Sequence, residues 1–523
     1  MTLSAEEQVT EMQTLPGVLT SETFAKLISV RGHRLLRMAR WLVRDSGPGE
    51  RLTRPLVGQL HAQATLLEEL LDAYGARRNR QWYPFRCIVA AIKLFSDVSY
   101  LLLHIQYAVP HYRLLLIEHD FHGDTQRALD FTGGVLLNSA SVLLEKADEL
   151  GVDVPHEDPP NAPYAEQLPA GRLAADRDIR PDDQAGQNIT HLATAFLNLA
   201  DESDLLYTPA KVPSHQYGDC FPDPVSEEGL RDLQDRFHNL QSMYDTYISA
   251  TETESADPDL SVLRGHITVI FHLLEAATLL AHHYERHICP RSDCEQVFFV
   301  APEDLLHILM DYALGYASRY LSCARSLCAE LLKRYSELGR VDVPVPRYRG
   351  FHVRPSTLVA KVVLHYGSDV QMELEGQVYD ANSPIEIFRA NEKINAQKRR
   401  WFASEIACLP DLWSGGNGRD TASAVREVVQ TLAAEGKVVV YQDPLEIKAE
   451  PSEQGTTLLQ AVTDEIARLQ ATGQLDIQAD LSVTFIGDRR ALADLQKLAE
   501  CGYGEDNLGN NIPLPDELKY LRR

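Results

Sequence analysis

The sequence predicts a multidomain protein in which an all-α, duplicated helical bundle precedes an α+β domain that carries an insertion. The chain has 523 residues, and a single hydrophobic core rarely grows beyond about 250–300 residues. Apolar residues recur at three- and four-residue spacing through most of residues 20–340, which is typical of amphipathic helices. After Pro344 the pattern changes to the alternation that is typical of strands, with further helices between them.

Composition and charge exclude some classes of partner. Hydrophobic residues make up 44% of the chain and charged residues 24%, as in ordinary globular proteins. The 50 Lys and Arg against 75 Asp and Glu give a net charge of −25. Binding to nucleic acid requires a concentrated basic face, and an anionic membrane surface would repel such a chain. We therefore expect neither nucleic acid nor a membrane as a partner.

The sequence also predicts a cytoplasmic location. The start, "MTLSAEEQVTEMQTLPG", lacks the basic and apolar regions of a signal peptide. The longest apolar candidate, residues 98–119, is interrupted by polar residues and a proline, so no uninterrupted run approaches the roughly 20 residues that span a bilayer. The eight cysteines follow no disulfide framework, and we expect them to be reduced.

The helical part divides into two blocks. Residues 20–155 contain four amphipathic stretches, each of which needs an apolar partner, so they predict the first copy of a bundle. Residues 156–225 are rich in Pro, Asp and Gly and form a connector, with one short helix near residues 189–200. Helical periodicity returns over residues 226–340, the second copy.

The two blocks share local sequence. "LEKADELGVDVP" (144–155) is similar to "LKRYSELGRVDVP" (332–344), and "YLLLHIQY" (100–107) is similar to "ATLLAHHY" (277–284). We interpret this as duplication of a helical module, although amphipathic helices of similar composition can also match by chance. Duplication predicts that the helices ending at Leu150 and Leu338 superpose in the two copies. It also predicts that the helices carrying Tyr107 and Tyr284 superpose.

Residues 341–523 are predicted to form the α+β domain. Alternating segments predict strands over 341–347, 370–375 and 378–381 in one antiparallel sheet. The last two strands are joined by a tight turn at Glu375-Gly376-Gln377.

One segment of this domain, "RGFHVRPSTLVA" (349–360), carries candidate chemistry. Gly350 allows a sharp turn out of the preceding strand, and Pro355 suits the first turn of a helix. We expect His352 to lie exposed over the N-terminus of a helix that begins near Arg354 and ends at Gly367.

This placement would create an anion site. The backbone amides of Val353 and Arg354 point outward at the helix start, and the helix dipole favours an anion there. Arg354 adds a fixed charge whose donors suit phosphate. The sequence places no second acid or base beside His352, so we expect a neutral imidazole that acts as the nucleophile. The alternative is that His352 only caps the helix beside a surface arginine.

The order of residues resembles a known family. "GFHVRPSTLVAK" is similar to the active-site segment of HPr, the phosphocarrier of the phosphoenolpyruvate-dependent sugar phosphotransferase system. The family pattern is Gly-apolar-His-x-Arg-Pro-Ala/Ser at the start of its first helix. A strand ("VQMELE"), a turn, a short strand ("VYDA") and "NSPIEIF" follow at HPr spacing, so the resemblance covers residues 341–395.

The resemblance implies an HPr-like open-faced sandwich and a phosphoryl carrier rather than a turnover enzyme. His352 would carry phosphate on Nδ1, held by Arg354 and by the amides of Val353 and Arg354. An Enzyme I-like protein would be the donor and an unidentified protein the acceptor, with no cofactor. Ser383 matches the family's regulatory phosphorylation site, with Asn382 in place of lysine. Ser383 followed by proline is also a sufficient helix N-cap.

The chain departs from the family after its second helix. It continues through "ANEKINAQKRRWF" without the expected glycine turn. The missing strand and helix could be residues 438–442 with 457–470, or 481–487 with 488–500. We favour the second pair because its strand and helix are directly joined, which makes residues 395–478 an insertion.

Two other motifs give weaker indications of a function. His283 and His287 share one helix face close to Cys289 and Cys294, but their spacing fits no standard zinc pattern, and we predict no metal site. "SGGNGRD" (414–420) lacks the Lys-Ser/Thr of a nucleotide-binding loop and is predicted to be a flexible loop.

Two functions of different classes remain open from the sequence, and a ligand- or metal-binding role of the helical half is a third, weaker option. The first is a regulatory phosphocarrier or phosphorelay protein. The second is a docking or scaffold protein that keeps the HPr-like fold, has a helical interaction module and is never phosphorylated. The sequence does not indicate an oligomeric state.

Overall fold

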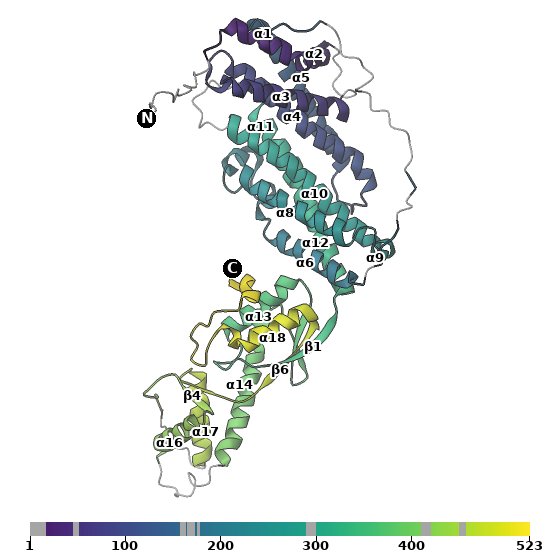
Figure 1. The fold of residues 1–523 in the computed structure, drawn as a ribbon. Helices are drawn as coiled ribbons and strands as arrows, with labels where there is room; N and C mark the ends of the chain where they lie inside the picture. Colours follow the sequence, from purple (N-terminus) through teal and green to yellow (C-terminus); the bar gives the residue numbers. More distant parts are fainter. Residues whose placement is uncertain are drawn as a thin grey trace, which may run out of the picture. The chain divides into compact units, whose positions relative to one another are not determined.

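The computed structural model describes residues 17–44, 52–156, 164, 173–174, 178–181, 183–288, 300–408, 420–448 and 457–522. The chain divides into two compact units. We call residues 1–181 with 199–324 the helical unit, and residues 182–198 with 325–523 the α+β unit. Their elements are labelled in Figure 1. The predicted multidomain, mostly helical architecture is confirmed.

The described part of the helical unit consists of helices of very different lengths. Its α-helices are α1 (Ser21–Arg31), α2 (His33–Arg44), α3 (Arg54–Ala73), α4 (Tyr83–Ala108), α5 (Phe121–Glu149), α7 (Thr208–Lys211), α8 (Glu227–Tyr247), α9 (Glu252–Ala256), α10 (Pro258–His283) and α11 (Pro302–His307). Its shorter elements are η1 (Ala76–Arg78), η2 (Val109–His111), η4 (Asp204–Tyr207), η5 (Ser214–Cys220), η6 (Tyr284–Ile288) and η7 (Ile308–Leu314). Two helices, α6 (Ala185–Asp201) and α12 (Gly315–Tyr335), contribute residues to both units.

Two central helices organise the helical unit. Helices α4 and α10 each have 26 residues and are apolar on most of their surface. Helix α4 packs against α3 and α5, and α10 packs against α8, η7 and α4. A helix that is apolar on most faces must be covered by neighbours, so these two helices lie at the centre of the core.

The same two helices are long and apolar enough to cross a membrane. The helical stretches are Tyr83–His111 and Pro258–Ile288, and in both 67% of the apolar window is buried inside the structure. Core helices of soluble proteins pass the same test of length and hydropathy. The sequence predicts no membrane-spanning run, because polar residues interrupt both stretches.

The duplicated blocks end differently. Helix α5 ends at Glu149, and Gly151 follows in the left-handed conformation with φ +69°. Helix α12 ends at Tyr335, and Leu338 already begins a strand. The prediction that residues up to 340 are all helical is therefore wrong at its end, because Leu338, Gly339 and Arg340 already pair with another strand. Superposition of the two copies stays a prediction.

The connector contributes to the α+β unit. Its helix α6 is longer than predicted, and its residues up to Asn198 belong to that unit. Thr194 donates a hydrogen bond to the carbonyl of Tyr366 at 3.0 Å and accepts one from Arg490 at 3.2 Å. Within the predicted connector, these polar contacts therefore fasten part of α6 onto the second unit.

The α+β unit contains one main sheet with helices packed against it. Its elements are β1 (Leu338–Pro344), α13 (Val353–Tyr366), β2 (Val370–Leu374), β3 (Gln377–Asp380), α14 (Pro384–Ala407), α16 (Thr421–Ala434), β4 (Val438–Val440), α17 (Leu458–Ala471), β5 (Leu475–Ile477), β6 (Ser482–Asp488), α18 (Arg489–Glu500), η8 (Gly502–Gly504) and η9 (Asp516–Arg522). The four-stranded sheet has the order β1-β6-β2-β3 and is antiparallel throughout. Phe485 of β6 is in register with Val341 of β1 and Met372 of β2.

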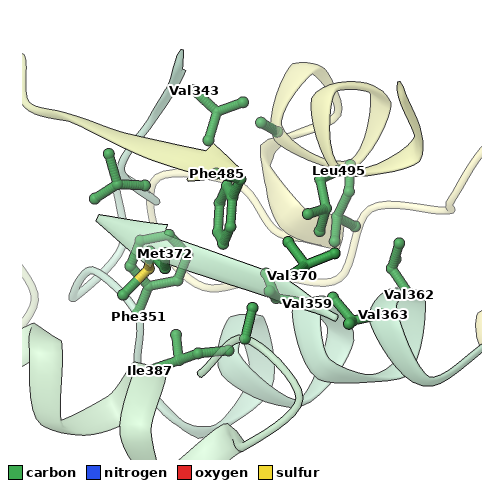
Figure 2. Close-up of a cluster of buried hydrophobic side chains, with 14 of the residues drawn as sticks. Val343, Phe351, Val359, Val362, Val363, Val370, Met372, Ile387, Phe485 and Leu495 are labelled. Atoms are coloured by element: carbon green, nitrogen blue, oxygen red, sulfur yellow. The ribbon is translucent and has the colours of Figure 1, made fainter. Parts of the chain in front are cut away.

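One face of this sheet forms the core of the unit. Val370, Met372 and Leu374 of β2 are buried, while Gln371 between them is exposed, as expected for a strand with one covered face. Figure 2 shows Met372 and Phe485 among apolar side chains of α13 and α18. This core fixes α13, and with it the position of His352.

The strands lie close to the predicted segments. Strand β1 begins three residues before the predicted 341–347 and ends at Pro344. Glu375 and Gly376 both have positive φ, so they form a two-residue hairpin turn, and Gln377 already belongs to β3. Of the two candidate closing pairs, residues 482–488 and 489–500 complete the main sheet, because β6 pairs with both β1 and β2.

The insertion has a core of its own. Strand β4 pairs with β5 in a separate two-stranded sheet that packs with α16 and α17. Helix α14 serves both cores: Ile387 and Ile394 lie in the main core, whereas Phe402 and Ile406 lie in the core of the insertion. This double role explains why α14 continues without the glycine turn expected after the second helix.

The C-terminal segment, residues 501–522, also packs on the main core. Tyr503, Leu518 and Leu521 are buried there, and the Tyr503 hydroxyl donates to the carbonyl of Pro344 at 2.8 Å. Sequence analysis assigned no element to this segment, although it supplies two side chains to the site described below.

Candidate functional site

A strained loop presents His352. Arg349 and Gly350 both have left-handed backbone angles, with φ +54° and +62°. The Asn391 side chain of α14 spans the loop: its Oδ1 accepts from the Phe351 amide and its Nδ2 donates to the Arg349 carbonyl, both at 2.9 Å. A Cβ on Gly350 would lie 2.2 Å from Asn391 Oδ1, so this close approach requires glycine.

The residues around the histidine hold it at the helix start. Phe351 is fully buried, with its ring edge against Tyr503 at 5.5 Å between centroids. Buried Ser356 donates to the Phe351 carbonyl at 2.9 Å. His352 is the N-cap of α13, which begins at Val353 rather than Arg354. Its side chain is only 24% exposed, less than the sequence predicted.

A carboxylate lies beside the histidine. His352 Nε2 is 2.8 Å from Glu505 Oε1, and the Glu505 side chain is 2% exposed. The prediction that no acid or base accompanies His352 is therefore wrong. Sequence reasoning missed Glu505 because the two residues are 153 positions apart and meet only through the C-terminal segment.

The short contact favours one tautomer of the ring. An ionised Glu505 carboxylate can only accept, so beside it a neutral His352 ring would carry its proton on Nε2 and donate it to Glu505. The lone pair then lies on Nδ1, which is the nitrogen that the resemblance assigns to the phosphoryl group.

At the start of α13, where the sequence predicts an anion site, one of the predicted groups already has a protein partner. No side chain caps α13, so its first amides, including that of the exposed Val353, have no side-chain acceptor among the described residues. The Arg354 guanidinium donates to the side-chain oxygen of Asn511. Arg354 is thus held beside the site by the C-terminal segment.

Ser383 has a structural role in the described chain. Its Oγ accepts from the Glu386 amide at 3.4 Å as the N-cap of α14, and Pro384 follows in the first turn. Ser383 lies at the start of α14, on another element from His352.

The insertion supports the loop from its other side. Asp476 Oδ2 of β5 accepts from the Arg349 amide at 3.0 Å and from Lys398 Nζ at 2.8 Å. The Lys398 and Asp476 side chains are each 3% exposed. Tyr348 has its ring edge toward His352 and toward Tyr441 of the insertion. No sequence signal identified this pair or Tyr441, because the contacts join distant segments.

The histidine pair in the helical unit forms no metal site in the part of the chain that the structure describes. No group of three or more His, Cys, Asp or Glu residues that could hold a metal is found there. The rings of His283 and His287 lie 5.0 Å apart, centroid to centroid. Cys289, Cys294 and the predicted loop at 414–419 lie outside the described residues.

These buried histidines predict a pH-dependent stability. Burial, with His287 and His282 nearby, lowers the pKa of His283 to about 3, and burial also lowers that of His287 to about 4. An unfolded histidine has a pKa of about 6.5, so below that pH the unfolded chain binds more protons than the folded one. The contribution of these neutral histidines to the free energy of unfolding is therefore fully present above pH 6.5 and decreases as the pH falls.

Between pH 7 and pH 5, the free energy of unfolding should fall by about 2 kcal/mol less in His283→Leu than in the wild type. The variant lacks one histidine that binds a proton in the unfolded chain but not in the folded one. Urea denaturation followed by helical circular dichroism measures it. His238→Leu, at an exposed position on α8, is the control and should keep the wild-type pH dependence. An unchanged dependence in His283→Leu would contradict the assignment.

Comparisons of the chain with protein-family models, with curated proteins and with solved structures return no match.

Proposed function

We propose that the α+β unit is an HPr-like phosphocarrier domain in which His352 accepts a phosphoryl group and passes it on. The motif around His352 supports this, together with the order of the elements. With the insertion left out, strand, helix, two strands, helix, strand and helix follow one another as β1, α13, β2, β3, α14, β6 and α18, the order that the resemblance implies.

One observation carries the proposal most directly. The buried carboxylate of Glu505 holds the Nε2–H of His352 and so leaves the Nδ1 lone pair available beside the uncapped start of α13. A nucleophile, anion-binding amides and a guanidinium within one helical turn are the groups that phosphoryl transfer requires.

The chemical step follows from these groups. Nδ1 attacks the phosphorus of the donor's phosphoryl group, a P–N bond forms, and the bond to the donor breaks with its electron pair staying on the donor. The ring becomes positively charged, and the Glu505 carboxylate stabilises that charge through Nε2–H. The amides of Val353 and Arg354 and the Arg354 guanidinium receive the phosphoryl oxygens. Transfer to an acceptor reverses these events.

The proposal includes partners and location. The donor is an Enzyme I-like protein, and the acceptor is another protein. Neither nucleic acid nor a membrane takes part, and the chain acts in the cytoplasm. Ser383 is a regulatory phosphorylation site whose phosphate would stand at the N-terminus of α14, where the helix dipole favours negative charge.

A second function, docking without phosphorylation, has one observation in its favour. The C-terminal segment and the insertion leave only 24% of the His352 side chain exposed, and Asn511 engages Arg354. A protein donor would have less access to this histidine than to an open helix start.

Labelling separates the two functions. Incubated with radiolabelled phosphoenolpyruvate and the host's Enzyme I-like protein, the wild type should gain an acid-labile, base-stable phosphate that His352→Ala lacks. Arg354→Ala should slow labelling by about a hundredfold, the scale for losing one preorganised electrostatic contact. Arg340→Ala removes an exposed arginine of β1 and is the control.

Each outcome has a defined meaning. Equal label in His352→Ala and the wild type would exclude His352 as the acceptor. A wild type that no donor labels, although His352 keeps its bond to Glu505 in solution, would favour the docking function.

A further inference from the structure

A pocket of about 380 Å³ lies beside His352 within the α+β unit. Helix α14 forms one wall, and the segment that joins α17 to β5 forms the other, so the insertion creates this pocket. Its lining includes Arg349, His352, Asn395, Arg399 and Thr472. The volume lies within the roughly 300–1,000 Å³ of small-molecule sites. A docking surface for a protein partner does not require such a cavity.

The charges of the pocket favour an anion. Arg399 is half-buried and has no hydrogen-bond or ion-pair partner among the described residues. The two acids of the lining do not cancel it: Asp476 is already paired with Lys398, and Glu392 is exposed to solvent. Arg399, a half-buried arginine without an ion-pair partner among the described residues, therefore lines the pocket together with the nucleophile.

The second arginine of the pocket is held in place. Arg349 Nη2 donates to the carbonyl of Gly473 at 2.7 Å. Its guanidinium carbon lies 5.2 Å from the ring centroid of Tyr348 and 5.6 Å from that of Tyr441. A fixed guanidinium loses little conformational entropy on binding, and its remaining donors match the oxygens of phosphate.

We propose that this pocket binds a small organophosphate, with its phosphate on Arg399 and Arg349, and that the bound molecule blocks His352. The polar side chain of Asn395 in the lining is available for the organic part of the ligand. The insertion thereby adds a metabolite-sensing site to a phosphocarrier domain. The blocking of His352 rests on the proposed function, whereas binding does not.

Binding is tested first on the full chain. Inorganic phosphate, glycerol 3-phosphate and glucose 6-phosphate are titrated, with glucose as the uncharged control, and the His352 ring signal is followed by NMR. That signal is assigned by its loss in His352→Ala. At least one monoester should shift it saturably and bind more tightly than inorganic phosphate, while glucose should have no effect.

Two adjacent arginines provide the matched variants. Arg399→Gln should weaken monoester binding at least tenfold, the scale for one charge-assisted contact. Arg400→Gln should leave it unchanged, because Arg400 is exposed and pairs with Glu375 at 2.9 Å. Circular dichroism establishes that both variants are folded.

Three results would contradict organophosphate binding in this pocket: no shift of the His352 signal with any phosphate compound at about 10 mM, equal weakening of binding in both variants, or inorganic phosphate binding as tightly as the monoesters.

The proposed blocking of His352 is tested by labelling with phosphoenolpyruvate and the Enzyme I-like donor. The saturating monoester should slow labelling of the wild type but not of Arg399→Gln, and an unchanged rate would refute blocking. If the wild type is never labelled, the phosphocarrier function fails while the binding result still decides the pocket.

Discussion

Glu505→Gln is expected to slow phosphoryl transfer to His352 by about a thousandfold while the protein stays folded. The amide can donate to Nε2, which moves the ring proton to Nδ1 and removes the lone pair that attacks phosphorus. In either orientation the amide lacks the negative charge that stabilises the ring once Nδ1 carries the phosphoryl group. Glu505 is therefore a positioning residue that acts through His352.

Two measurements separate this role from general stability. The ¹⁵N signals of the His352 ring should report Nε2–H in the wild type and a larger Nδ1–H population in Glu505→Gln. Glu517→Gln, an exposed position of the same C-terminal segment, should match the wild type in rate and spectrum. A wild-type transfer rate in Glu505→Gln would show that the hydrogen bond does not control the nucleophile.

Lys398→Met is expected to lower the free energy of unfolding of the α+β unit by about 4 kcal/mol. Lys398 and Asp476 form a buried ion pair, and removing one partner leaves an unmatched charge away from water, a change that typically costs about 3–5 kcal/mol. Asp476 also accepts from the Arg349 amide, so the His352 loop should loosen as well. Urea denaturation measures the first effect and hydrogen exchange at residues 349–351 the second.

A double variant identifies the cause. Lys398→Met with Asp476→Asn keeps an acceptor for the Arg349 amide but removes the unmatched charge, and it should recover at least half of the lost stability. Lys393→Met, at a less buried position of α14, should change stability little. If the double variant is no more stable than Lys398→Met, an unmatched charge is not the source of the loss.

The elements that depend on local sequence were predictable. Ser383 followed by proline predicts a helix cap, and in the structure its hydroxyl accepts a hydrogen bond from the amide three residues ahead. The turn between β2 and β3 is predicted at Glu375-Gly376-Gln377, and in the structure Glu375 and Gly376 adopt the required left-handed angles while Gln377 begins β3. The directly joined strand and helix at 481–500 are favoured because the family that the motif resembles joins its last strand and helix just as directly.

Short or shared elements were not predictable. Strand β5 has three residues, "LDI", too few to show a period, and it exists because β4 pairs with it. Lys398 lies in a basic stretch of α14 that is typical of a solvated helix face, yet it is buried because the insertion supplies Asp476. Burial of a charge depends on a partner that periodicity does not reveal.

The sequence by itself determined the helical character of the first part, the strands around the motif, and His352 and Arg354 as the candidate site residues. These depend on spacing and turn chemistry within about ten residues. Only the tertiary structure decided that Glu505 orients the ring, that Asn511 engages Arg354 and that the insertion forms a pocket beside the histidine. The physical reason is that each of these contacts joins segments far apart in the chain, which meet because separate apolar faces pack into a common core.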